Sequence, residues 1–91
     1  MSWTRVAPAI VQHDAGYLVR PDGRTRLLYV DGDTSAVVTV EYGGPYVAIY
    51  AGTVRWDDDA IPPMTRAEVQ TVLERMCDGL RAMDVEFQVF E

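Results

Sequence analysis

The segment 65–83 constrains the fold more than any other part of the chain, because it carries the one clear helix pattern. Thr65 is followed three residues later by Glu68, which is the spacing of a capping box. In that motif each of the two side chains accepts a hydrogen bond from a backbone N–H left unpaired at the helix start. Apolar residues then recur at spacings of three and four, namely Val69, Val72, Leu73, Met76, Leu80 and Met83. This spacing is typical of an amphipathic helix, so one face of the helix must pack against another part of the chain.

Other residues of this helix lead to three further expectations. Arg75 and Arg81 both lie three positions from Asp78, which predicts ion pairs on the polar face. Cys77 borders the apolar stripe and is expected to be a small core residue. Gly79 weakens the helix interior by about 1 kcal/mol relative to alanine. A close approach of the sheet is one reason for a glycine here, and the sequence leaves that reason open.

Before the helix, the pattern changes to alternation with a period of two, which predicts a meander of β-strands. The predicted strands are 10–12, 17–20, 25–30, 36–42 and 46–50, and a short extended piece then leads to Trp56. The turn signal at 21–24, Pro-Asp-Gly-Arg, is strong because proline presets the first turn position and glycine tolerates positive φ. In the strand 36–42, we expect Val38, Val40 and Tyr42 to face the core.

The charged and doubly proline-broken segment 57–63 cannot continue a sheet, so it connects the strands to the helix. After the helix, alternation in 85–90 predicts a final strand that returns to the same sheet. The predicted fold is therefore α+β. It consists of an antiparallel sheet of about five to six strands with one amphipathic helix packed on one face. A chain of 91 residues predicts one domain, residues 1–91.

Charge argues against nucleic acid as a partner. The net charge is −6 and the pI is about 4.5, so a phosphate backbone would be repelled unless basic residues clustered strongly. Arg20, Arg24 and Arg26 come closest to such a cluster, but Asp22 lies among them. A basic protein partner is the more natural expectation, and the alternative is that the acidity only keeps the domain soluble.

The cysteine content and the lack of targeting segments bear on redox chemistry and on cellular location. Cys77 is the only cysteine, which excludes an intramolecular disulfide and a multi-cysteine metal site. The beginning of the sequence lacks a secretion signal, and no stretch approaches the roughly 20 apolar residues of a membrane span. We therefore expect a cytoplasmic protein that binds no membrane.

Two features of the sequence bear on catalysis and metal binding. His13 is the only histidine, and its neighbour Asp14 could orient it as a general base, but an exposed turn histidine without catalytic function is the favoured interpretation. The acidic run 57–59 could bind a hard cation, but it lacks the alternating ligands, central glycine and distal glutamate of an EF-hand loop. We expect no catalytic residue, no metal site and no cofactor.

The sequence favours a protein-binding role for the same acidic residues, because clustered carboxylates speed the encounter with a basic partner. The first candidates are Asp57, Asp58 and Asp59, and the second are Asp31, Asp33 and Glu41. A solvated loop without function is the alternative.

Trp56 is expected to be a packing anchor rather than a ligand platform. Three tyrosines, Tyr42, Tyr46 and Tyr50, are expected to be buried. The alternative is that they are exposed and form part of an interface with a partner.

The C-terminal half of the chain, 41–91, resembles a known family. The residues that carry the resemblance are Tyr46-Val-Ala-Ile-Tyr, Val54-Arg-Trp56, the acidic loop to Pro62-Pro63, Thr65-x-x-Glu68, and the helix followed by a short strand. This pattern is similar to the immunity protein 74 family of bacterial polymorphic toxin systems. The resemblance implies a small α+β protein in the cytoplasm of the toxin-producing cell, where it neutralises a cognate toxin. It implies no functional residue, because the matching positions are those of structural residues.

Together these observations predict an immunity protein that binds a cognate toxin with a basic surface and blocks it by stoichiometric occlusion. A nuclease is one kind of toxin that would fit, because nucleases present basic, phosphate-binding clefts. Two other classes stay open. One is a homodimeric module that pairs through an exposed edge strand in the segment 85–90, because an unpaired edge invites a partner. The other is a small enzyme that uses His13.

Overall fold

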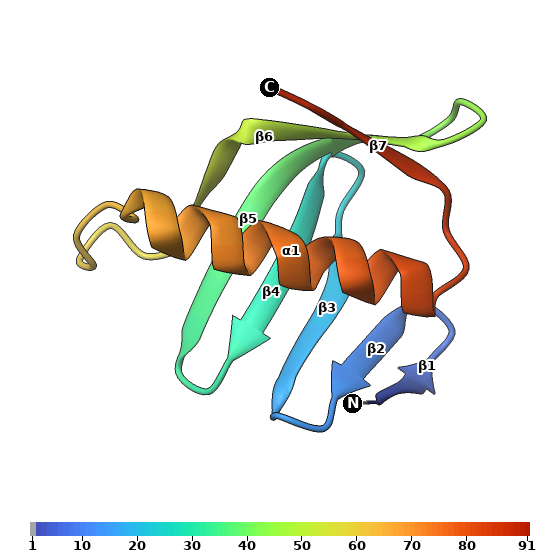
Figure 1. Ribbon diagram of the computed structural model, residues 1–91, viewed down its shortest axis with the longest axis horizontal. Helices are drawn as coiled ribbons and strands as arrows, with labels where there is room; N and C mark the ends of the chain where they lie inside the picture. The colour runs from blue at the N-terminus through green and yellow to red at the C-terminus, as the bar shows by residue number, and fades with distance from the viewer. Residues whose placement is uncertain (1) are drawn as a thin grey trace.

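A seven-stranded sheet forms the body of the molecule in the computed structural model, which describes residues 2–91 (Figure 1). The strands lie side by side in chain order: β1 (Trp3–Ala7), β2 (Ile10–His13), β3 (Tyr17–Asp22), β4 (Arg26–Asp31), β5 (Thr34–Glu41), β6 (Val47–Trp56) and β7 (Phe87–Phe90). Every pair from β1 to β6 is antiparallel, as short turns require. The predicted α+β class is confirmed, with one or two strands more than expected.

The helix α1 (Arg66–Ala82) crosses one face of the sheet and contacts β1 to β4 and β6 (Figure 1). Both hydrogen bonds of the capping box are present. The Glu68 N–H donates to Thr65 Oγ1 at 3.1 Å, and the Thr65 N–H donates to Glu68 Oε1 at 2.9 Å. The helix therefore begins where the sequence predicts.

The core lies between α1 and the face of the sheet that the helix covers. Val72, Met76 and Leu80 from the helix are each at most 3% exposed, and the predicted apolar stripe is confirmed. Cys77 is also buried against this core, as predicted. The sheet contributes the buried residues Val11, Tyr17, Val19, Leu27, Tyr29, Ala36, Val38, Val40, Val47, Ile49 and Val54.

Gly79 lies where the helix packs tightly against β3. A Cβ atom at this position would come within 2.9 Å of Val19 Cβ and Cγ2, closer than real contacts allow. Val19 is fully buried, so it has little room to move away. The glycine is therefore explained by the helix–sheet contact that the sequence left open.

The last pair of strands departs from the antiparallel pattern. β7 pairs in parallel with β6, from Val47 opposite Phe87 to Tyr50 opposite Phe90. The reason is the connection: α1 carries the chain back along the sheet, so β7 enters in the same direction as β6. β7 is also an edge strand, since the sheet ends there.

The face of the sheet away from α1 has no second layer among the described residues, yet part of it is dry. Leu28 and Val37 pair across β4 and β5 and are 7% and 1% exposed. The same cross-strand row continues to Arg20 on β3 and Arg55 on β6. The aliphatic stems of such arginines can cover apolar neighbours while their charged ends stay in water.

Three local expectations of the sequence analysis are wrong. Pro21 is not a turn residue but part of β3, at a position beyond the β2 pairing, which reaches only Val19. Proline is tolerated where a strand has an unpaired side. The turn is shifted towards Gly23, which has φ +74°. Tyr42 follows the end of β5 and is 41% exposed rather than in the core. β1 was not predicted at all.

Candidate partner-binding surface

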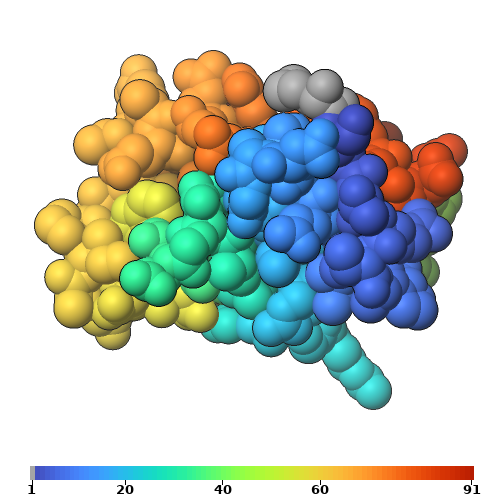
Figure 2. Space-filling model, turned by 90° about the horizontal axis from the view of Figure 1, so that it is seen from below, coloured from blue at the N-terminus to red at the C-terminus, as the bar shows by residue number. Residues whose placement is uncertain are grey.

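The sheet brings most of the predicted acidic residues to one end of the molecule. Asp31 is the last residue of β4, Asp33 lies in the turn before β5, and the segment 57–59 follows the end of β6. The two segments are neighbours, because Ala36 pairs with Trp56 and the Asp57 N–H donates to the Ser35 carbonyl at 2.8 Å. In Figure 2 the gold loop after β6 lies beside the green start of β5. We refer to Asp31, Asp33, Asp57, Asp58 and Asp59 as the acidic end.

Glu41 does not join this group. It lies at the opposite end of β5, seven residues from Thr34, and its carboxylate accepts a hydrogen bond from the Tyr50 hydroxyl. The structure therefore separates Glu41 from the other five predicted contact residues.

The carboxylates of the acidic end differ in how far they are already paired. Asp57 lies 3.7 Å from Arg26 Nη2, and Asp58 accepts a hydrogen bond from the Ala60 N–H at 2.9 Å. Within residues 2–91, the Asp33 and Asp59 side chains make no hydrogen bond or ion pair. All five residues are exposed. Over the described part of the chain, no three histidine, cysteine, aspartate or glutamate side chains are grouped so as to hold a metal ion.

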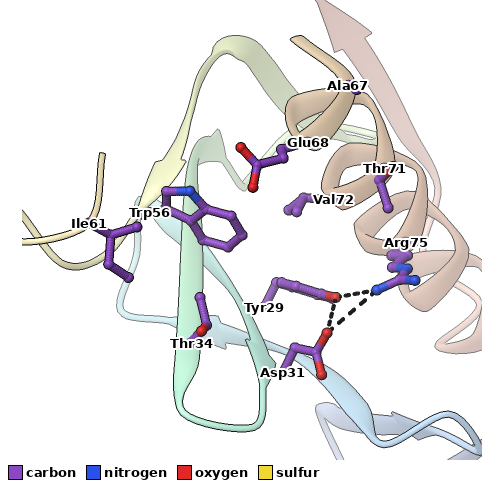
Figure 3. Close-up of a pocket in the computed structure, with 10 residues that line it drawn as sticks. All are labelled: Tyr29, Asp31, Thr34, Trp56, Ile61, Ala67, Glu68, Thr71, Val72 and Arg75. Carbon is purple, nitrogen blue, oxygen red and sulfur yellow. Dashed lines mark hydrogen bonds and ion pairs between the residues drawn. The ribbon is translucent and has the colours of Figure 1, made fainter. Parts of the chain in front are cut away.

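Asp31 also borders a groove between α1 and the sheet, which we call the helix groove (Figure 3). Its volume is about 590 Å³, and it is lined by Tyr29, Asp31, Thr34, Trp56, Ile61, Ala67, Glu68, Thr71, Val72 and Arg75. Trp56 forms one wall, and the Glu68 carboxylate points towards the indole ring (Figure 3). The groove therefore combines an aromatic surface with carboxylates from both the sheet and the helix.

Three polar side chains close one side of the helix groove. Arg75 Nη1 donates to the Tyr29 hydroxyl at 2.6 Å, and this hydroxyl donates to Asp31 Oδ2 at 3.1 Å. Arg75 Nη1 also lies 3.6 Å from Asp31 Oδ2, and its guanidinium lies 4.3 Å from the centre of the Tyr17 ring. Arg75 does not pair with Asp78, contrary to the prediction, because it turns towards the sheet; only Arg81 makes that pair, at 2.7 Å.

This network affects how its members ionise. Burial raises the pKa of the Tyr29 hydroxyl because the phenolate would be poorly solvated, and the Arg75 hydrogen bond only partly opposes that effect. The hydrogen bond to Tyr29 raises the pKa of Arg75. Arg75 is therefore a permanent positive charge whose partners within the protein are already in place.

Trp56 is partly buried and packs against the hydrophobic core, as the sequence predicts. It also borders a second hollow, on the side of Asp58, Asp59 and Ile61. Trp56 is therefore both a packing residue and an accessible surface between two sets of carboxylates. From the sequence, these two roles are alternatives.

His13 is the last residue of β2 and is 6% exposed, so the expectation of an exposed turn histidine is wrong. Its ring stacks on Tyr17 at 4.6 Å between centroids and meets the edge of Trp3. Nδ1 accepts a hydrogen bond from the Ala15 N–H at 2.9 Å, so the Asp14 carboxylate does not hold this nitrogen. In its described surroundings, His13 serves the packing between β1 and β3.

A second aromatic surface lies at the far end of the sheet from the acidic end. Tyr46 and Tyr50 approach Phe90, with ring centroids 6.4 and 6.1 Å apart, and Phe90 and Val89 are about 40% exposed. Tyr46 and Tyr50 are half-buried, so the expectation of buried tyrosines holds only in part. This surface adjoins the open edge of β7.

Sequence reasoning missed Tyr29, Arg75 and Glu68 as members of one site. From the sequence, Arg75 and Glu68 both belong to the polar side of the helix, and Glu68 also belongs to the capping box. The signal that could have revealed the groove is the position of Arg75 beside the apolar stripe, one residue before Met76. The partner of Arg75 is far away in sequence, however, and only the helix–sheet packing identifies it.

Comparisons with protein-family models, with curated proteins and with solved structures gave no match to this chain. The resemblance to the immunity protein 74 family therefore continues to depend on the residues named above. Within residues 2–91, no helix has both the length and the apolar character needed to cross a membrane.

Proposed function

We propose that this protein is an immunity protein that binds a cognate bacterial toxin and blocks it by stoichiometric occlusion, in the cytoplasm of the toxin-producing cell. The partner is a protein with a basic active-site surface, for which a nuclease is the leading example. The acidic end is the proposed contact.

One observation carries this proposal: the fold gathers five carboxylates from two separate segments onto one exposed end. Within residues 2–91, only Asp31 and Asp57 among them have an arginine within 4 Å. Concentrated negative charge attracts a basic partner over distances of about 8 Å at physiological salt and raises the association rate. Such a surface can then fill or cover a cleft that would otherwise hold phosphate groups.

The test begins with the reading frame next to this gene, which the proposal predicts to encode a toxin-like domain. Co-expression should restore growth to cells that the toxin domain alone inhibits, and the purified proteins should form a one-to-one complex. The association rate should fall steeply as salt increases. A domain that neither binds nor is neutralised, or an association rate independent of salt, would contradict the proposal.

A charge-removing triple variant locates the contact. Asp33→Asn, Asp58→Asn and Asp59→Asn together should lower the association rate at low salt by about tenfold or more, because steering depends on the local charge. The matched control removes three exposed charges elsewhere, through Glu74→Gln, Glu86→Gln and Glu91→Gln. If both triple variants slow association equally, only the net charge matters and the acidic end is not the contact.

The β7 edge favours a second candidate, a homodimeric interaction module. β7 is an edge strand, and the Val89 and Phe90 side chains are exposed beside it. Sedimentation at several concentrations decides this point. A dimer that is lost on substitution of Val89 by Lys would support the module, and a monomer at all concentrations would eliminate it.

A further inference from the structure

The helix groove has a chemical character that the acidic end alone does not explain. Trp56 separates two hollows, and each of them contains carboxylates: Asp31 and Glu68 on one side, and Asp58 and Asp59 on the other. An aromatic face bordered by carboxylates is a favourable environment for an organic cation. The ring attracts the cation electrostatically, and the carboxylates pair with its N–H groups.

The charges inside the helix groove also favour a cation. The groove contains Asp31, Glu68 and Arg75, two acids and one base, so its formal charge is −1. Arg75 is already held by the Tyr29 hydroxyl, by Asp31 and by the Tyr17 ring. An anionic ligand would have to compete with Asp31 for Arg75, and it would also face the Glu68 carboxylate.

Hydrogen-bonding capacity stays free on both acids. Glu68 uses Oε1 for the Thr65 N–H, and Asp31 uses Oδ2 for Tyr29 and Arg75. Within residues 2–91, the second carboxylate oxygen of each makes no hydrogen bond or ion pair. Figure 3 shows the Glu68 carboxylate beside the Trp56 ring, with Asp31 across the groove.

We propose that the helix groove receives one arginine side chain of the partner protein, stacked on Trp56 and paired with Glu68. This inference rests on the proposed function and adds the chemistry of the recognised group. A volume of about 590 Å³ is within the roughly 300–1,000 Å³ of ligand pockets, so it admits a long side chain together with part of its backbone. The planar guanidinium suits both the stacking and the pairing.

A peptide titration tests the groove without the toxin. The probe is acetyl-Gly-Arg-Gly-amide, and its control is the same peptide with citrulline, which has nearly the same shape and no charge. The readout is the indole N–H signal of Trp56 in NMR spectra, with Trp3 as an internal control because it packs on His13 and Tyr17 instead. The arginine peptide should shift Trp56 in a saturable way and leave Trp3 unchanged. An unmoved Trp56 signal, or equal shifts with both peptides, would overturn the proposal.

The Glu68→Gln variant removes the proposed charge contact while keeping an oxygen that can accept the Thr65 N–H. It should weaken peptide binding about threefold, as expected for an ion pair at an exposed carboxylate. Glu74→Gln, on the same helix but outside the helix groove, is the matched control and should bind the peptide as the wild type does. Thermal unfolding of both variants verifies that the fold is retained.

Kinetics with the toxin domain separate this inference from the proposed function. Glu68→Gln should raise the dissociation rate about threefold and leave the association rate unchanged, whereas the acidic-end variant changes the association rate. If Glu68→Gln behaves like Glu74→Gln, the inference is wrong and the proposed function stands. If the toxin domain does not bind at all, the proposed function is wrong, and the peptide titration still decides the chemistry of the groove.

Discussion

Tyr29 links the sheet to the helix through a single hydroxyl group. The residue is 2% exposed, and its hydroxyl accepts from Arg75 and donates to Asp31. Because the ring fills the core while the hydroxyl reaches the groove, packing and polar contacts can be changed separately at this position.

We expect the Tyr29→Phe substitution to lower the free energy of unfolding by about 1–2 kcal/mol, because it removes the hydrogen bonds of the hydroxyl group and keeps the ring. Urea denaturation measures this change. Tyr42→Phe is the control, since Tyr42 is exposed and makes no side-chain hydrogen bond to another described residue. Equal stability of the Tyr29→Phe variant and the wild type would show that the network contributes nothing to folding.

The same residue should affect stability at alkaline pH. The folded protein raises the pKa of Tyr29 above its ordinary value of about 10, mainly through burial. A raised pKa means that the folded state holds the proton more tightly, so this stabilisation is complete below about pH 10 and is lost as pH rises through the folded pKa. The Tyr29→Phe variant should therefore lose less stability than the wild type as the pH rises above about 10. Parallel curves of unfolding free energy against pH would contradict this expectation.

At the scale of elements, the contact between α1 and β3 sets the distance between the two layers. Gly79 faces Val19 in this contact, and a methyl group on Gly79 would overlap the Val19 side chain. Two opposing effects can therefore be compared at one position: the higher helix propensity of alanine and the cost of overpacking.

We expect Gly79→Ala to destabilise the protein. Alanine would gain about 1 kcal/mol in helix propensity, but overpacking a rigid core costs about 1–3 kcal/mol, and Val19 cannot move away easily. Gly52→Ala is the control, because nothing lies within 4 Å of the added methyl group and φ is not positive. Adding Val19→Ala should recover part of the loss, so the double variant should lose less stability than the sum of the single ones. If Gly79→Ala stabilised the protein, the helix and the sheet could move apart at this contact at little cost, and the gain in helix propensity would dominate.

For the whole molecule, one core cluster joins the helix to the strands β2 to β6. Cys77 belongs to this cluster and is 7% exposed, and burial raises the pKa of its thiol. A thiol reagent needs both access and the thiolate, so Cys77 should react only after the layers separate.

The labelling rate of Cys77 should therefore follow global unfolding. In urea below the unfolding midpoint, it should rise about tenfold for each 1.4 kcal/mol of lost stability. A Gln70→Cys variant in a Cys77→Ala background is the control, because position 70 is exposed and its labelling should not depend on urea. A Cys77 labelling rate independent of urea would reveal a local opening of α1.

The sequence by itself determined the parts of the protein that depend on near neighbours. The capping bonds of Thr65 and Glu68, the apolar stripe of α1 and the order of the meander follow from interactions over a few residues, and the structure confirms them. For the same reason, the acidic segment 57–59 could be named as a candidate site from composition alone.

Only the tertiary structure decided which distant residues meet. It placed β7 parallel to β6, buried His13, turned Arg75 from Asp78 to Tyr29, and separated Glu41 from the acidic end. These outcomes depend on how α1 lies across the sheet and on the pairing of strands far apart in sequence. Periodicity reports which face of an element is apolar, but it contains no information on which partner covers that face.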